Sequence, residues 1–159
     1  KAPFPSSMAL NFSERLLNWY VEQGRDLPWR GIDDPYKIWL SEVILQQTQV
    51  KQGWQYYERF CALFPNVAAL AAAPLDDLMK AWEGLGYYSR AKNLHKAAKQ
   101  VVSEHDGELP DTVEELLKLP GIGPYTARAI AAFALSAGLL LLMAMSIACW
   151  HAIWATTRP

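Results

Sequence analysis

The sequence predicts an all-α fold with short connections. Apolar residues recur at helical spacing through most of the first 135 residues, and no alternating stretch of useful length predicts a strand. Signals that start or break helices lie between these stretches, at Asp34-Pro35, at Thr112 with Glu115, and from Gly121 to Pro124. The chain has 159 residues, of which 52% are hydrophobic and 19% charged, so it can form a core and is not of disordered composition.

Each expected helix is bounded by a proline, a glycine or a capping residue. The first carries Phe12, Leu16 and Trp19 and ends at Gly24. The later ones are expected at 35–45, 52–64, from 66, 74–84, 89–105, from 112 and 124–134. Four tryptophans occupy helical positions and are expected in the core: Trp19, Trp39, Trp54 and Trp82.

Composition excludes several classes of protein. The net charge of −1 gives no general attraction to nucleic acid, so such binding would need local charge. Two cysteines, Cys61 and Cys149, are too few for a disulfide scaffold or a four-cysteine metal site. No basic segment followed by an apolar run opens the chain, and secretion is therefore not expected.

The chain changes character near Leu135. Residues 136–159 hold a single charge, Arg158, whereas residues 1–135 hold all 16 acids and 14 of the 15 lysines and arginines. About 20 apolar residues can cross a bilayer, so a membrane-anchored helical protein is one interpretation of this tail.

A glycine corner separates the last two expected helices. Gly121, Ile122 and Gly123 allow a tight turn, and the helix that begins at Pro124 offers unpaired N–H groups that suit a phosphate oxygen. Upstream, no acid lies between Glu83 and Glu104, which leaves a basic stripe of Arg90, Lys92, Lys96 and Lys99. A plain helical corner beside a solvated helix face accounts for the same spacing.

Glu42 lies among apolar residues and is followed by Gln46, Gln47 and Thr48. In an apolar site desolvation raises the pKa of a carboxyl, which then keeps a proton to donate near neutral pH. The glutamines offer donors and acceptors for base edges. The alternative is an exposed glutamate on a helix flank.

Two aromatic stretches have a functional and a packing interpretation. Tyr87 and Tyr88 follow Gly84-Leu85-Gly86, and aromatics on such a turn can wedge into a base stack. Trp29 and Arg30, after Leu27-Pro28, can sandwich a flat ring or close the edge of a core.

Together these stretches resemble the MutY family of adenine DNA glycosylases, within the helix-hairpin-helix superfamily. The resemblance covers about residues 27–135 and rests on LPWR, DPYKIWLSEVILQQTQV, AWEGLGYYSRAKNLHKAA and LPGIGPYTARAIAAFA, in that order. It implies hydrolysis of the N-glycosidic bond of adenine mispaired with 8-oxoguanine or guanine, after the base is flipped from the duplex. It also implies a bacterial cytoplasmic, nucleoid-associated protein that needs no membrane and no oligomer.

The resemblance assigns roles to individual residues. Glu42 is the acid that protonates the departing adenine, with Tyr125 beside it. Bifunctional relatives carry a Schiff-base lysine where Tyr125 stands, so a monofunctional hydrolase is implied. Leu27, Trp29 and Arg30 match the adenine pocket, and Gln46, Gln47, Thr48, Tyr87 and Arg90 the contacts to DNA and the 8-oxoguanine strand. Gly121, Ile122 and Gly123 match the hairpin that holds a phosphate, often with a monovalent cation.

The sequence departs from the family pattern in three ways. The family carries an aspartate after the hairpin, in a V-D-G-N-V stretch, that stabilises the sugar cation; here no acid follows Glu115. The four cysteines of the family's iron–sulfur cluster and its C-terminal domain are also missing, so no cofactor and no metal are expected in this chain. We therefore expect an impaired catalyst.

A shifted reading frame would explain the missing aspartate. Codons compatible with residues 139–159, read one base earlier, can encode V-D-G-N-V. Some letters are forced, since Met143-Ala144 must then give glycine and Cys149-Trp150 leucine. The expected organisation is an N-terminal helix of a second lobe at 1–25, a largely complete six-helix DNA-binding and catalytic region at 26–135 with its hairpin at 119–126, and a non-native tail at 136–159. A non-catalytic DNA-binding module is the main alternative.

Overall fold

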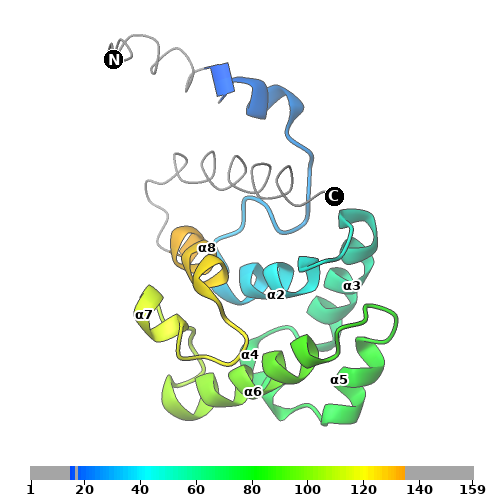
Figure 1. The fold of residues 1–159 in the computed structure, drawn as a ribbon, viewed down its shortest axis with the longest axis vertical. Coiled ribbons are helices and arrows are strands. Elements are labelled where there is room, and N and C mark those ends of the chain that lie inside the picture. The colour runs from blue at the N-terminus through cyan, green and yellow to red at the C-terminus, as the bar shows by residue number, and fades with distance from the viewer. Residues whose placement is uncertain (1–14, 17, 135–159) are drawn as a thin grey trace, which may run out of the picture. The chain divides into compact units, whose positions relative to one another are not determined.

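The computed structural model describes residues 15–16 and 18–134, and every regular element in that part of the chain is a helix (Figure 1). These residues fall into two units, one ending at Leu27 and one beginning at Pro28. The first unit contributes a helical segment that reaches residue 23 and is followed by Gly24. The all-α prediction is thus confirmed for the described residues.

The helices of the second unit begin and end close to the expected positions. Asn66 caps one of them by accepting the N–H of Ala69 at 2.8 Å, and Thr112 caps another by accepting the N–H of Glu115 at 3.4 Å. Their bounds are α2 Pro35–Leu45, α3 Val50–Leu63, α4 Val67–Ala72, α5 Leu75–Ala81, α6 Ser89–Glu104, α7 Val113–Leu116 and α8 Pro124–Ala134.

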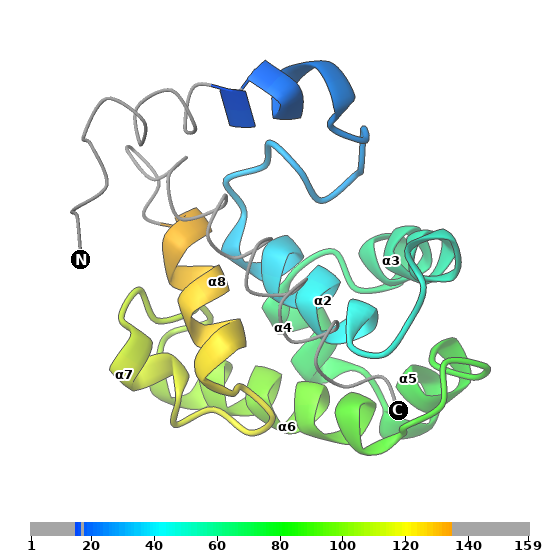
Figure 2. The same cartoon turned by 45° about the horizontal axis from the view of Figure 1, so that its top comes forward.

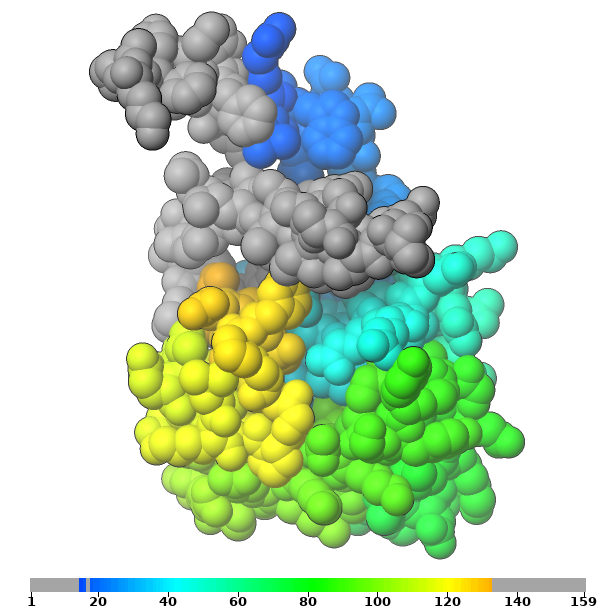
Figure 3. Space-filling view, in the orientation of Figure 1, coloured from blue at the N-terminus to red at the C-terminus, as the bar shows by residue number. Residues whose placement is uncertain are grey.

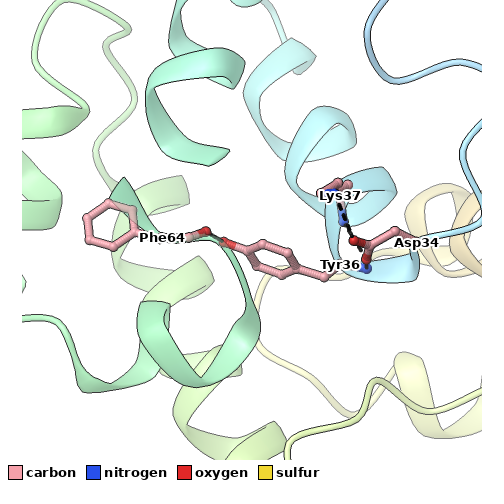
Figure 4. Close-up of polar contacts among 4 residues, drawn as sticks. All are labelled: Asp34, Tyr36, Lys37 and Phe64. Atoms are coloured by element: carbon pink, nitrogen blue, oxygen red, sulfur yellow. Dashed lines mark hydrogen bonds and ion pairs between the residues drawn. The ribbon is translucent and has the colours of Figure 1, made fainter. Parts of the chain in front are cut away.

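Helix α2 is buried on nearly all sides. Asp34 starts it by accepting the N–H groups of Tyr36 and Lys37 at 3.0 and 3.3 Å, and Pro35 occupies the first turn, where no N–H is needed (Figure 4). Apart from Lys37 and Glu42, every residue from position 36 to position 44 is buried. The helix therefore has no broad solvent face and acts as the axis of the core.

Two helices flank α2. It packs against α3 on one side and α8 on the other, while α6 packs against α4 and α5 (Figures 1 and 2). The α2–α3 contact is close at Gly53, where a Cβ would lie 2.7 Å from Cδ2 of Leu45. At the other end of α3, the buried Tyr36 hydroxyl donates to the Phe64 carbonyl at 2.6 Å (Figure 4). These contacts fix α2 relative to its neighbours.

Several expected details are wrong. Helix α3 begins at Val50 rather than 52, and α5 ends at Ala81 rather than 84. Trp39 and Trp82 are buried as expected, but Trp54 is only half-buried and Trp19 is 55% exposed. A single helical segment buries little surface by itself, and the described part of the first unit offers no second helix to cover Trp19.

No helix within residues 15–16 and 18–134 is long and apolar enough to span a bilayer. The apolar tail, with its membrane-anchor and frameshift interpretations, lies outside the described residues.

The Tyr36–Phe64 hydrogen bond should contribute measurably to stability. We expect Tyr36→Phe to lower the free energy of unfolding by about 1–3 kcal/mol, because the Phe64 carbonyl loses its donor in a buried place. Urea unfolding monitored by circular dichroism measures the change. Lys37→Ala is the control, because its ion pair with Asp34 is half-exposed and should contribute less than about 1 kcal/mol. Equal losses in the two variants would contradict the assignment.

Candidate active site and nucleic-acid interface

Glu42 is the only acidic residue within α2, and it is half-buried. Among the described residues, no hydrogen bond or ion pair engages its carboxyl group. Burial in these surroundings disfavours the charged form and raises the pKa of Glu42 from 4.5 to about 7. The carboxyl group can therefore hold a proton at neutral pH and release it there, as a general acid must.

Helix α8 packs directly on α2, so the helix of Tyr125 is a neighbour of the helix of Glu42 (Figure 1). Tyr125 is the second residue of α8, and its side chain is 48% exposed. Its phenol has no amine with which to form a Schiff base, so it does not support lyase chemistry of the lysine type.

The glycine corner joins α7 to α8 and lies against α6. Gly121 has a φ of +81°, and a Cβ there would lie 2.8 Å from Cβ of Asn93, so both its conformation and its space require glycine. Figure 3 shows this yellow corner in contact with the green surface that includes α6. The corner is thus packed closely against the side chain of Asn93.

The three corner residues do different things. Ile122 is buried, and its N–H donates to the Leu119 carbonyl at 3.2 Å, so its amide is used within the corner. Gly121 and Gly123 are exposed, and nothing lies within 4 Å of a Cβ placed at Gly123. This open approach to the start of an eleven-residue helix suits an anion. Ile122 serves as the apolar anchor of the corner, and its expected phosphate contact stays a prediction.

The expected DNA-contacting residues lie in two segments with unusual backbone. Gln47, two residues after the end of α2, has a φ of +55° and is exposed, while Gln46 and Thr48 on either side are half-buried. Tyr87, two residues before the start of α6, has a φ of +45° and is 64% exposed. Non-glycine residues rarely adopt positive φ, and such strain is concentrated at functional sites.

Arg90 does not extend into solvent as the basic-stripe interpretation required. Its guanidinium donates to main-chain carbonyls at the end of α2 and in the loop before α6, and it stacks over the rings of Trp82 and Tyr87. Desolvation lowers its pKa from the ordinary value. Lys92, Lys96 and Lys99 are exposed and form the stripe without it.

A cleft of about 80 Å³ brings three of the expected segments together. Gln46, Arg90 and Gly121 border it, with Trp39, Val43, Ser89, Asn93, Leu94 and Pro120. Ligand pockets usually measure about 300–1,000 Å³, so the cleft is too small to be a base pocket. A larger hollow of about 370 Å³ is bordered by α5 residues, Glu83 and Tyr88, and it contains none of the residues to which the resemblance assigns a role.

The residues expected at the adenine pocket have packing roles. Trp29 is half-buried and meets the rings of Tyr57 and Trp54 edge-on, with centroids 5.3 and 6.1 Å apart. Arg30 is also half-buried, and Leu27, the last described residue of the first unit, is buried. Trp29 thus closes an edge of the core, and contact of these three residues with adenine stays a prediction.

Sequence reasoning missed the residues that hold these segments in place. Asn93 packs against Gly121, and Tyr56 and Gln52 on α3 bond to the loop before Tyr87. No sequence pattern links positions so far apart. Within the described part of the chain, no group of three or more His, Cys, Asp or Glu side chains is placed to hold a metal ion. The monovalent cation at the corner stays a prediction.

A helical fold, a half-buried acid and a glycine corner at a helix start agree with the helix-hairpin-helix class of base excision repair proteins that the resemblance implied. The model of the HhH-GPD superfamily of base excision DNA repair proteins matches residues 40–149, and the chain belongs to this superfamily. The match includes the first part of the apolar tail.

Adenine DNA glycosylases are among the relatives of the chain. That of Buchnera aphidicola subsp. Baizongia pistaciae is 48% identical over 125 residues, 78% of this chain. That of Mus musculus is 45% identical over 132 residues, 77% of this chain. The chain spans 36% and 26% of their lengths, respectively.

Solved structures share the fold. A thermostable thymine-DNA glycosylase matches with a TM-score of 0.72 and 28% identity, covering 78% of this chain and 58% of that one. An endonuclease III trapped as a covalent DNA intermediate matches with a TM-score of 0.69 and 21% identity, covering 84% and 62%. The latter likeness shows the fold alone.

The raised pKa of Glu42 predicts a pH-dependent loss of stability. The carboxyl group titrates near 7 when folded and near 4.5 when unfolded, so its contribution is fully present below pH 4.5 and is lost as pH rises to 7. The free energy of unfolding of Glu42→Gln is therefore compared with that of the native chain at two pH values. The difference should shift in favour of the variant by about 1–3 kcal/mol between pH 4.5 and pH 8. Urea unfolding at both pH values measures this, with exposed Glu114→Gln as control. The same pH-dependent gain in both variants would contradict the assignment.

The corner predicts a contrast between its glycines. Gly121→Ala should destabilise the chain by at least about 1 kcal/mol more than Gly123→Ala, because only position 121 combines positive φ with a close neighbour. Thermal unfolding of the two variants tests this. Equal stabilities would show that the corner relaxes freely.

Proposed function

We propose that this chain carries the catalytic and DNA-contacting core of an adenine DNA glycosylase. Its substrate is duplex DNA with adenine opposite 8-oxoguanine or guanine. Membership of a base excision repair superfamily and the adenine DNA glycosylases among its relatives support this choice. Such chemistry belongs in the bacterial cytoplasm, at the nucleoid.

The observation that carries the proposal is the half-buried Glu42 with a pKa of about 7. Its protonated form gives its proton to the departing adenine as the N-glycosidic bond breaks. The carboxylate then accepts a proton from the water whose oxygen bonds to the sugar carbon. The acid returns to its starting form, and the products are free adenine and an abasic sugar.

Tyr125 makes the reaction hydrolytic. A lyase of this superfamily uses an amine at this place to form a covalent intermediate, and a phenol cannot do so. Water is therefore the nucleophile, and the DNA strand stays intact at the abasic site.

The DNA is held by main-chain groups and by exposed side chains. Gln47 and Tyr87 enter the base stack, on the side of the 8-oxoguanine strand, with Gln46 and Thr48 behind them. The amides of Gly121 and Gly123, with a monovalent cation, receive a phosphate of the strand. Exposed lysines on α6 add charge along the backbone, since phosphate contacts supply most of the affinity of such proteins.

Catalysis in this chain is slow. No acid follows Glu115 in the sequence, and the family's cation-stabilising aspartate is among the missing acids. Loss of one preorganised stabilising group typically reduces the rate by about 10²–10³.

A single-turnover assay on a duplex with one adenine opposite 8-oxoguanine tests the proposal. The native chain should release adenine about 10²–10³ more slowly than a full-length adenine DNA glycosylase. Release should decline as pH rises above about 7, because Glu42 loses its proton. Glu42→Gln should bind the duplex and release no adenine.

Glu114→Gln, exposed on α7, is the control and should keep the native rate. Adenine release that survives Glu42→Gln would remove Glu42 from the role assigned here. Salt-dependent duplex binding with no release by any variant would instead identify a DNA-binding module without chemistry.

A further inference from the structure

The guanidinium of Arg90 joins two segments that are about 40 residues apart in sequence. Its Nη1 donates to the carbonyls of Val43 at 3.0 Å and Ile44 at 3.3 Å, and to that of Gln46. Its Nη2 donates to the carbonyls of Leu85 at 3.2 Å and Gly86 at 3.4 Å. One planar group thus bonds to both the end of α2 and the loop before α6.

The charge of Arg90 suits the end of α2 and not its own helix. Arg90 is the second residue of α6, where the positive end of the helix dipole disfavours a cation. Its guanidinium lies instead against the last carbonyls of α2, which carry the negative end of a dipole and lack partners within the helix. The side chain therefore stabilises the end of α2 rather than the start of α6, its own helix.

The loop from Glu83 to Gly86 is fixed at every carbonyl. Tyr56 donates to the Glu83 carbonyl at 2.6 Å and Gln52 to that of Gly84 at 3.3 Å. Trp82 donates to the Gly86 carbonyl at 2.9 Å, and Arg90 bonds to those of Leu85 and Gly86. The loop cannot shift without breaking several of these bonds, so it is a rigid base for Tyr87, the next residue.

Each joined segment carries one exposed residue in a strained conformation. Gln47 follows the Gln46 carbonyl and Tyr87 follows the Gly86 carbonyl, and both have positive φ. Burial of the Arg90 guanidinium costs free energy, because no carboxylate among the described residues pairs with it and its buried Nε has no partner there. Two strained residues and a buried cation without a carboxylate partner lie at one place, which indicates that function requires this arrangement of the two segments.

We propose that Arg90 is a positioning residue that couples Gln47 and Tyr87, so that the two side chains enter the base stack as one unit. This rests on the proposed function only for what the two side chains do with DNA. The coupling belongs to the free protein. It differs from the expected role of Arg90 as a direct DNA contact, because its donors face main-chain carbonyls.

Hydrogen exchange of the free native chain tests the coupling without any variant. The Thr48 N–H bonds to Leu45 and the Leu85 N–H bonds to Trp82, so both amides report local opening. If Arg90 couples the segments, both amides should open with the same free energy and the same denaturant dependence. Independent openings in the native chain would overturn the proposal.

The Arg90→Lys variant keeps the charge and loses the planar fork. Exchange at Thr48 and at Leu85 should both become about tenfold faster or more. Arg128→Lys, at an exposed position of α8, is the matched control and should change neither amide. Faster exchange at only one of the two segments would overturn the proposal.

A double-mutant cycle shows whether the coupling acts on DNA. Dissociation constants for the mismatched duplex are measured for Gln47→Ala, Tyr87→Ala and the pair, in the native chain and in Arg90→Lys. In the native chain the pair should deviate from additivity by about fivefold or more, and in Arg90→Lys it should be additive. Equal deviations in both backgrounds would overturn the proposal. A native chain that binds no duplex would refute the proposed function, while the exchange results would still decide the coupling.

Discussion

Burial of α2 is the constraint on which the rest of the structure depends. The helix packs against α3 and α8, and between Pro35 and Leu45 its only strongly polar residues are Lys37, Ser41 and Glu42. The same enclosure that stabilises the fold withholds solvent from Glu42, so a single packing arrangement supplies both the core and an acid with a useful pKa. Stability and chemistry are in conflict at that residue, because the core would be more stable without its carboxylate.

The main-chain groups at two helix ends supply further binding contacts. The end of α2 presents carbonyls to a guanidinium, and the start of α8 presents amides to the open space beside Gly123. Both are main-chain features that any sequence forming these helices would share. What this sequence adds is the residues that make the ends accessible and fixed: Gly121, with positive φ, and Arg90, which reaches across from α6.

Local signals predicted the helices well. Asp34-Pro35, Thr112 and the glycine corner act through neighbours within four residues, so the sequence alone shows them. The bonds from Arg90 to the end of α2 could not be predicted, because these acceptors lie more than 40 residues away in sequence and only packing brings them close to Arg90. The positive φ of Gln47 likewise has no sequence signal. For Glu42 the sequence showed an acid among apolar residues, but only the fold decides how far it is buried.

The fully bonded loop before Tyr87 bears on how this protein can change over time. Its carbonyl acceptors are matched by donors from α3, from α6 and from Trp82. Replacement of Tyr56 or Gln52 would alter no residue proposed to meet DNA, yet it would remove a donor from the loop that precedes the exposed ring of Tyr87. Substitutions on α3 can therefore alter substrate selectivity, although they lie outside the proposed DNA contacts. Inherited variants at these positions merit the same scrutiny as variants of the residues proposed to contact DNA.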